Sequence, residues 1–83
     1  MVNAVAEVDN ILKIQTFTLL SLDMGPGLAG IESRLVAIYV LRKTLSYVLN
    51  STTVDILLSQ HCRRMESTLR SLLMLLISWA IAI

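Results

Sequence analysis

The chain is poor in the residues that build covalent, catalytic or metal-centred sites. It has one cysteine, Cys62, and one histidine, His61, among 83 residues. A single cysteine excludes an internal disulfide, and zinc takes about four ligands. On a helix these neighbours point about 100° apart, so they do not form a Cys–His nucleophile pair. We therefore expect no metal or cofactor, a packed Cys62, and a solvated His61 beside Arg64.

Glycine and proline are also scarce, and they lie close together. All three glycines and the only proline fall between residues 25 and 30. Pro26 has no N–H and disfavours helical geometry in the residue before it, and glycine frees the backbone on either side. The pattern predicts one sharp turn at 23–27. A phosphate loop is excluded, because neither a following Lys-Ser/Thr nor a third spaced glycine after a strand is present.

Charged residues make up only 16% of the chain, and aromatic residues 5%. The basic cluster of His61, Arg63, Arg64 and Arg70 has no interleaved aromatic side chain, and we expect no nucleic-acid binding. The carboxylates are too dispersed to act as a general acid–base pair. We therefore expect neither catalysis nor a small-molecule substrate.

The few charges are unevenly distributed. Residues 1–32 balance to −3 and residues 33–83 to +4. This asymmetry can orient copies head to tail or steer the basic half to an anionic surface, although ordinary solvated helix faces also explain it. The first nine residues have no Lys or Arg and include Glu7 and Asp9, which argues against a secretory signal. An intracellular location is favoured.

Hydrophobic periodicity predicts an all-α fold, either a small three-helix bundle or a helical hairpin with a long C-terminal helix. We expect a single helical domain, 1–83, with helices over about 2–22, 28–49 and 53–82. Gln15 occupies the one polar slot of the first apolar stripe. Residues 14–20 are rich in β-branched and aromatic side chains, so a strand is the alternative there.

Polar residues are expected to mark the solvated side and the ends of these helices. Glu32, Arg34, Arg42 and Lys43 define the solvated side of the second helix. The Asn50–Thr53 segment predicts a helix stop followed by an N-cap, and Asp55 falls in the first turn of the third helix, where a negative charge suits the dipole.

The third segment carries the strongest pattern. Apolar residues recur at alternating spacings of four and three, which predicts one continuous helix face that packs on a partner helix. This predicted interaction face consists of Leu58, Cys62, Met65, Leu69, Leu72, Leu76, Trp79 and Ile83. After Arg70 no charge remains. The apolar run 71–83 is about 20 Å long as a helix, against a bilayer core of about 30 Å.

Hydrophobic residues make up 55% of the chain, more than the roughly 45–50% of average globular proteins. A chain this small cannot hide that much apolar surface alone. The sequence therefore predicts a non-enzymatic interaction or oligomerisation protein that buries apolar helix faces against copies of itself or a partner protein. The alternative is a small membrane-associated protein, with segment 71–83 inserted and Arg63, Arg64 and Arg70 at the headgroups or another anionic surface.

Overall fold

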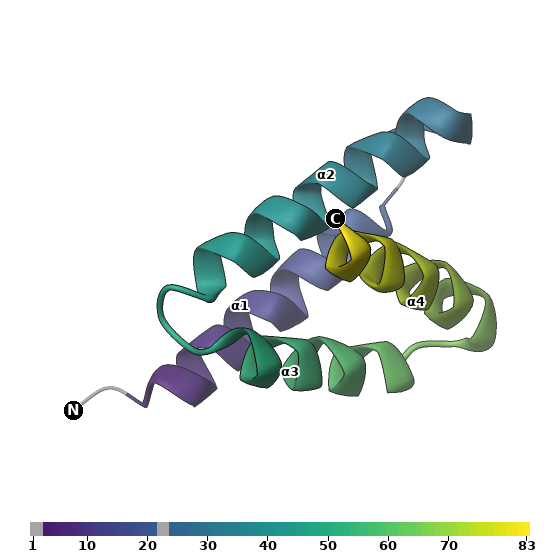
Figure 1. Ribbon diagram of the computed structural model, residues 1–83. Coiled ribbons are helices and arrows are strands. Elements are labelled where there is room, and N and C mark those ends of the chain that lie inside the picture. The colour runs from purple at the N-terminus through teal and green to yellow at the C-terminus, as the bar shows by residue number, and fades with distance from the viewer. Residues whose placement is uncertain (1–2, 22–23) are drawn as a thin grey trace.

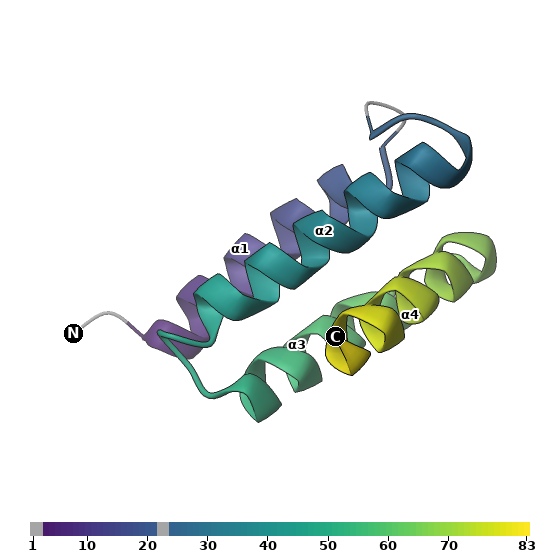
Figure 2. The same cartoon turned by 45° about the horizontal axis from the view of Figure 1, so that its top comes forward.

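The predicted all-α fold is confirmed. The computed structural model describes residues 3–21 and 24–83, and these residues form helices and no strands. The helices are α1 (Ala4–Leu19), α2 (Gly27–Leu45), α3 (Ser51–Arg63) and α4 (Ser67–Ala82). They form two layers, with α1 and α2 side by side in one and α3 and α4 in the other (Figures 1 and 2). The α2 helix packs most extensively on α4, and α1 packs on α3.

The segment 14–20, for which a strand was the alternative, is helical through Leu19. The threonine hydroxyls help to explain why. Thr16 Oγ1 donates to the Leu12 carbonyl at 2.7 Å and Thr18 Oγ1 to the Ile14 carbonyl at 3.1 Å. These bonds satisfy the hydroxyls inside a helix and offset the β-preference of the residues. The expected helix limits Val2 and Leu22, and Asp23 of the expected turn, lie outside the described residues.

Gln15 does not occupy the core position that we predicted for it. It is exposed, and Thr16 is buried instead. The buried positions of α1 are Val8, Leu12, Thr16 and Leu19. A hydroxyl that bonds its own helix can be buried at lower cost than a carboxamide with several unpaired groups.

The predicted turn around Pro26 is present, and Arg34 holds it together. Gly25 and Gly27 adopt positive φ values of 84° and 68°. Arg34 was expected on the solvated side, but it is only 8% exposed. Its guanidinium donates to three carbonyls at the end of α1 and in the turn: Leu19 at 2.7 Å, Ser21 at 2.9 Å and Gly25 at 3.1 Å. The free-energy cost of burying this cation is therefore offset, because Nε, Nη1 and Nη2 each donate a hydrogen bond.

The connection between α2 and α3 is fixed by a cap and an ion pair. The α2 helix ends at Leu45 rather than near residue 49, and Asn50 caps α3 by accepting the Thr53 N–H at 2.8 Å. Arg42, expected on the solvated side, pairs with Asp55 through two bonds of 2.6 and 3.0 Å. This hydrogen bond raises the pKa of Arg42.

The prediction of a single long helix over 53–82 is wrong, because residues 64–66 interrupt it and separate α3 from α4. The α3 helix ends at Arg63 with Arg64 as its C-cap, and the Glu66 side chain caps α4 by accepting the Leu69 N–H at 3.2 Å. A straight helix would be about 45 Å long and would project past its neighbours of about 30 Å. The break folds α4 back onto α2, so that its apolar residues enter the core (Figure 1).

All four helices contribute to one hydrophobic core between the two layers. Its buried members include Leu12 from α1, Ile38 from α2, Leu58 from α3, and Leu73 and Leu76 from α4. Each of these side chains is fully buried. Full burial of such a side chain contributes roughly 1.5–3 kcal/mol, so the core depends on α4 as much as on the other helices.

The Arg34 arrangement predicts a large stability loss on substitution. Arg34→Met removes the guanidinium donor from three carbonyls near the turn, and we expect the free energy of unfolding to fall by about 3 kcal/mol. Guanidinium denaturation followed by circular dichroism measures this loss. The matched control is Arg63→Met, since Arg63 is exposed and should change stability by less than about 0.5 kcal/mol. Equal effects of the two substitutions would contradict the assigned role of Arg34.

Gly30 provides the space for the Gly25 carbonyl to reach Arg34. A Cβ at position 30 would lie 2.0 Å from the Gly25 carbonyl oxygen. Glycine to alanine inside a helix normally stabilises by about 1 kcal/mol, but here we expect Gly30→Ala to destabilise by about 2 kcal/mol. Thermal unfolding checks this, with Ser33→Ala on an exposed part of the same helix as the control. A higher melting temperature for Gly30→Ala would refute the close approach.

Candidate interaction site

The structure divides the predicted interaction face among different environments. Because of the break at 64–66, its eight residues do not form one continuous surface. Leu58, Cys62 and Leu76 are buried in the chain's own core, Met65 and Leu72 are partly buried against that core, and Leu69, Trp79 and Ile83 are exposed. The apolar residues that the sequence assigned to a partner are therefore used partly for folding.

The α4 helix exposes apolar side chains as well as burying them. Leu73, Leu76, Ile77 and Ala80 face the core. Around the rest of the helix, Met74 and Ile81 are exposed on one flank, and Leu75, Trp79 and Ile83 on the other. We call these five residues the α4 outer face. Trp79 is 42% exposed, a notable fraction for a side chain whose apolar area is among the largest. No charged residue follows Arg70 to interrupt this face.

The predicted headgroup residues lie around the corner between α3 and α4. Arg63 and Arg64 are exposed, and Arg70 is partly buried. Arg63 lines a shallow hollow with Met74 and Ile81 of the α4 outer face. One cation therefore lies directly beside the apolar surface.

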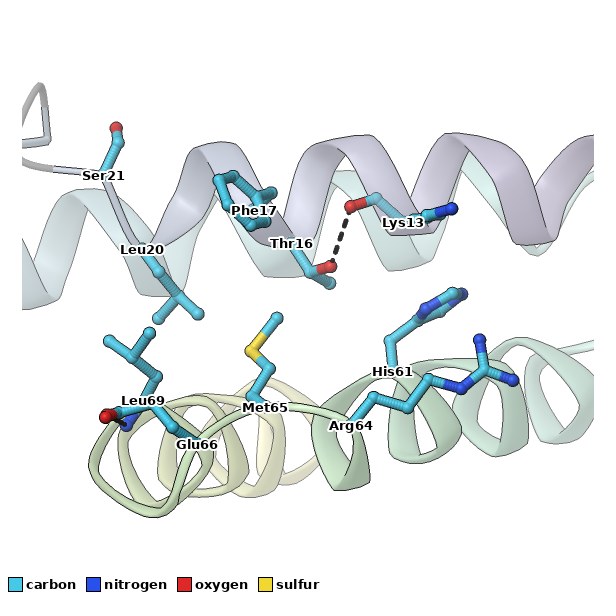
Figure 3. Close-up of a pocket in the computed structure, with 10 residues that line it drawn as sticks. All are labelled: Lys13, Thr16, Phe17, Leu20, Ser21, His61, Arg64, Met65, Glu66 and Leu69. Carbon is cyan, nitrogen blue, oxygen red and sulfur yellow. Dashed lines mark hydrogen bonds between the residues drawn. The ribbon is translucent and has the colours of Figure 1, made fainter.

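A second apolar surface is a groove of about 450 Å³ between the C-terminal half of α1 and the α3–α4 corner (Figure 3). Leu20 of the α1 end, Met65 of the corner and Leu69 of α4 approach one another across it (Figure 3). Phe17 lies at its rim and is 80% exposed. We call this surface the α1–corner groove.

The polar groups of the α1–corner groove are arranged by charge. Lys13, His61 and Arg64 lie toward one end, and Glu66 lies toward the other (Figure 3). Lys13 and Arg64 are exposed and form no ion pair with another described residue. Glu66 also accepts the N–H of Leu69, so its carboxylate is held at the start of α4, where the helix dipole favours negative charge.

His61 is not the solvated residue that the sequence suggested. It is 4% exposed, and its Nε2 lies 2.9 Å from Asp9 Oδ1. This contact joins α1 to α3. Hydrophobic periodicity does not predict it, because the two residues are 52 positions apart in the sequence. The exposed Lys13 and Arg64 are the other charged groups lining the groove beside the His61 ring. The Asp9–His61 pair has a structural explanation, because each partner satisfies the other at a helix–helix contact.

The predicted burial of Cys62 is confirmed. Its thiol is 2% exposed and donates to the Arg70 carbonyl at 3.4 Å. Burial raises the pKa of the Cys62 thiol, although the nearby Arg70 and Arg63 oppose the effect. Nucleophilic cysteines depend on a lowered pKa and access, and this thiol has the opposite properties. Among the residues that the structure describes, no group of three potential metal ligands comes together.

Comparisons with known proteins supply no analogy for these surfaces. No protein family, characterised protein or solved structure matches the chain. Within the described residues, no helix has the length and hydropathy needed to cross a bilayer.

The environment of Cys62 predicts slow chemical modification. In the folded chain, iodoacetamide at mildly alkaline pH should alkylate the thiol about 100-fold more slowly than in the unfolded chain, because burial and a raised pKa both reduce the accessible thiolate. Mass spectrometry of quenched samples gives the two rates. The same chain in guanidinium chloride is the control, and equal rates would show that the thiol is accessible.

Proposed function

We propose that this chain is a non-enzymatic helical interaction protein that buries its α4 outer face against another protein surface, with a second copy of the chain as the partner. The observation that carries this proposal is the uncharged α4 outer face, where Leu75, Trp79 and Ile81 remain exposed although α4 already contributes to the core. Large apolar patches on small soluble proteins mark interaction sites.

The amount of surface supports association. The chain has 5462 Å² of accessible surface, whereas a compact monomer of its 9.2 kDa is expected to have about 4,900 Å². Tryptophan and other large side chains at the centre of an interface contribute most of its binding energy. Trp79, flanked by Leu75 and Ile83 one turn away on either side, fits that role.

Charge complementarity favours a second copy as the partner. Glu7 and Glu32 are exposed in the acidic half of the sequence, and Arg63 and Arg64 are exposed in the basic half. When the acidic half of one copy meets the basic half of another, opposite charges come together, which speeds and orients the encounter.

The titratable groups support a role without catalysis. His61 is engaged with Asp9, and the Cys62 thiol is engaged with a backbone carbonyl. Neither is placed to activate the other as a nucleophile and base, which would require a direct hydrogen bond between them.

Association with a membrane surface is the second candidate function. The specific observation that favours it is the position of Arg63 beside Met74 and Ile81. A cation next to an exposed apolar helix face is typical of helices that lie in the headgroup region.

Leu75→Glu tests the proposal. The full chain, purified without detergent, should form a defined oligomer that dissociates on dilution in sedimentation experiments. Leu75→Glu should raise the dissociation constant at least about 10-fold, because it places a charge in a desolvated interface. The control Thr52→Glu adds the same charge at an exposed position in the first turn of α3, where the helix dipole accepts it.

Point substitution is the appropriate test because removal of α4 would delete core residues and unfold the chain. Far-UV circular dichroism verifies that both variants stay helical. A chain that is monomeric at every concentration, and that floats with anionic lipid vesicles unless Leu75 is replaced by Glu, would replace the oligomer proposal with the membrane candidate. An oligomer that Leu75→Glu leaves unchanged would remove the α4 outer face from the interface.

A further inference from the structure

The α1–corner groove and Phe17 form a cavity and a protruding side chain on the same surface. The ring of Phe17 is 80% exposed at the rim, and the floor beside it is formed by the apolar side chains of Leu20, Met65 and Leu69. We propose that two copies of this chain pair about a two-fold axis, with Phe17 of each copy seated in the α1–corner groove of the other. The inference rests on the proposed self-association and specifies a contact separate from the α4 outer face.

The geometry of a two-fold contact favours this arrangement. In such an interface the same patch is used on both copies, so it must be complementary to itself. A patch that carries both a protruding aromatic ring and an adjacent apolar groove meets this condition: when one ring enters the partner's groove, the second ring enters the first groove. A groove of about 450 Å³ is within the size range of sites that bind organic groups of this kind.

The side chains of the groove suit an aromatic occupant. Met65 lies between Leu69 and His61 on the corner side of the groove (Figure 3). Methionine is flexible, and its thioether makes favourable contacts with aromatic rings. Each Phe17 would also contact its counterpart near the rim, where aromatic pairs prefer offset or edge-to-face packing. Phe17 thereby becomes buried without any change in the chain's own fold.

The charges at the two ends of the groove agree with the same pairing. Lys13 and Arg64 lie at one end and Glu66 at the other (Figure 3). A two-fold arrangement can place the cationic end of each copy against the anionic end of its partner, so the opposite charges meet twice. This complementarity within one patch favours a second copy over an unrelated apolar partner.

Photocrosslinking tests the contact directly. Phe17 is replaced by benzoylphenylalanine in the full chain, which is irradiated as a mixture of ordinary and ¹⁵N-labelled copies. Crosslinked dimers of mixed isotope content are digested and sequenced by mass spectrometry. We expect crosslinks from position 17 of one copy to Met65 or Leu69 of the other. Mixed-isotope dimers crosslinked at the α4 outer face instead, or oligomers without any crosslink from position 17, would overturn the inference.

Equilibrium measurements provide the second test. Phe17→Ser should raise the dissociation constant of the dimer by about 100-fold, because two aromatic rings are lost from each dimer. Tyr47→Ser is the matched control, since Tyr47 is an aromatic residue of similar exposure, 82%, away from the groove. Equal effects of the two substitutions would also reject the contact.

The outcomes separate this inference from the proposed function. A chain that is monomeric throughout would refute both. An oligomer that Leu75→Glu dissociates and Phe17→Ser leaves intact would refute the groove contact and support the α4 outer face as the interface. An oligomer weakened by Phe17→Ser, with crosslinks to Met65 or Leu69, supports the groove contact.

Discussion

The fold depends on one buried cation. Arg34 reaches from α2 to the end of α1 and donates to three carbonyls of the helix end and the turn. Unpaired carbonyls of this kind are costly when they are withdrawn from water. Gly30 keeps the space that the arrangement needs. Together they fix α1 and α2 as a paired layer, and the second layer of α3 and α4 packs against that layer (Figure 2).

The break between α3 and α4 then determines which apolar residues belong to the core. A continuous helix would have left most of the residues after Arg70 in solvent. The fold-back brings Leu73, Leu76 and Ile77 into the core and turns Leu75 and Trp79 outward. The apolar surface that stays exposed is what folding leaves uncovered, and the α4 outer face and the α1–corner groove are two parts of it. Both proposed contacts use this uncovered surface.

Several features could be predicted because they depend on local chemistry. Periodicity identified the all-α class, the glycines around Pro26 identified the turn, and the Asn50–Thr53 segment identified a helix stop followed by a helix start, although the cap is Asn50 itself. Cys62 was correctly expected to be packed. The break at 64–66 had a local signal that we did not use: Arg63 and Arg64 suit the end of a helix, and Glu66 suits the start of the next. The long apolar stripe outweighed it.

Other features could not be predicted, because they depend on contacts between distant segments. The burial of Arg34 requires the turn to be formed, and the burial of His61 requires Asp9 to lie opposite it. Gln15 is exposed and Thr16 is buried, although they are adjacent in α1. Which of the two is buried depends on where the neighbouring helices lie. The groove likewise exists only because the α3–α4 corner lies beside α1, and no single segment encodes it.

The position of Arg34 has a consequence for biosynthesis. The end of α1 cannot acquire its hydrogen-bonding partner until residue 34 has left the ribosome, and the core is not complete until Ile77 and Ala80 follow. Early helices therefore emerge with their apolar sides uncovered for most of the synthesis of the chain. Exposed surface of this kind attracts chaperones and neighbouring nascent chains, so copies made on the same message could meet before either has finished folding.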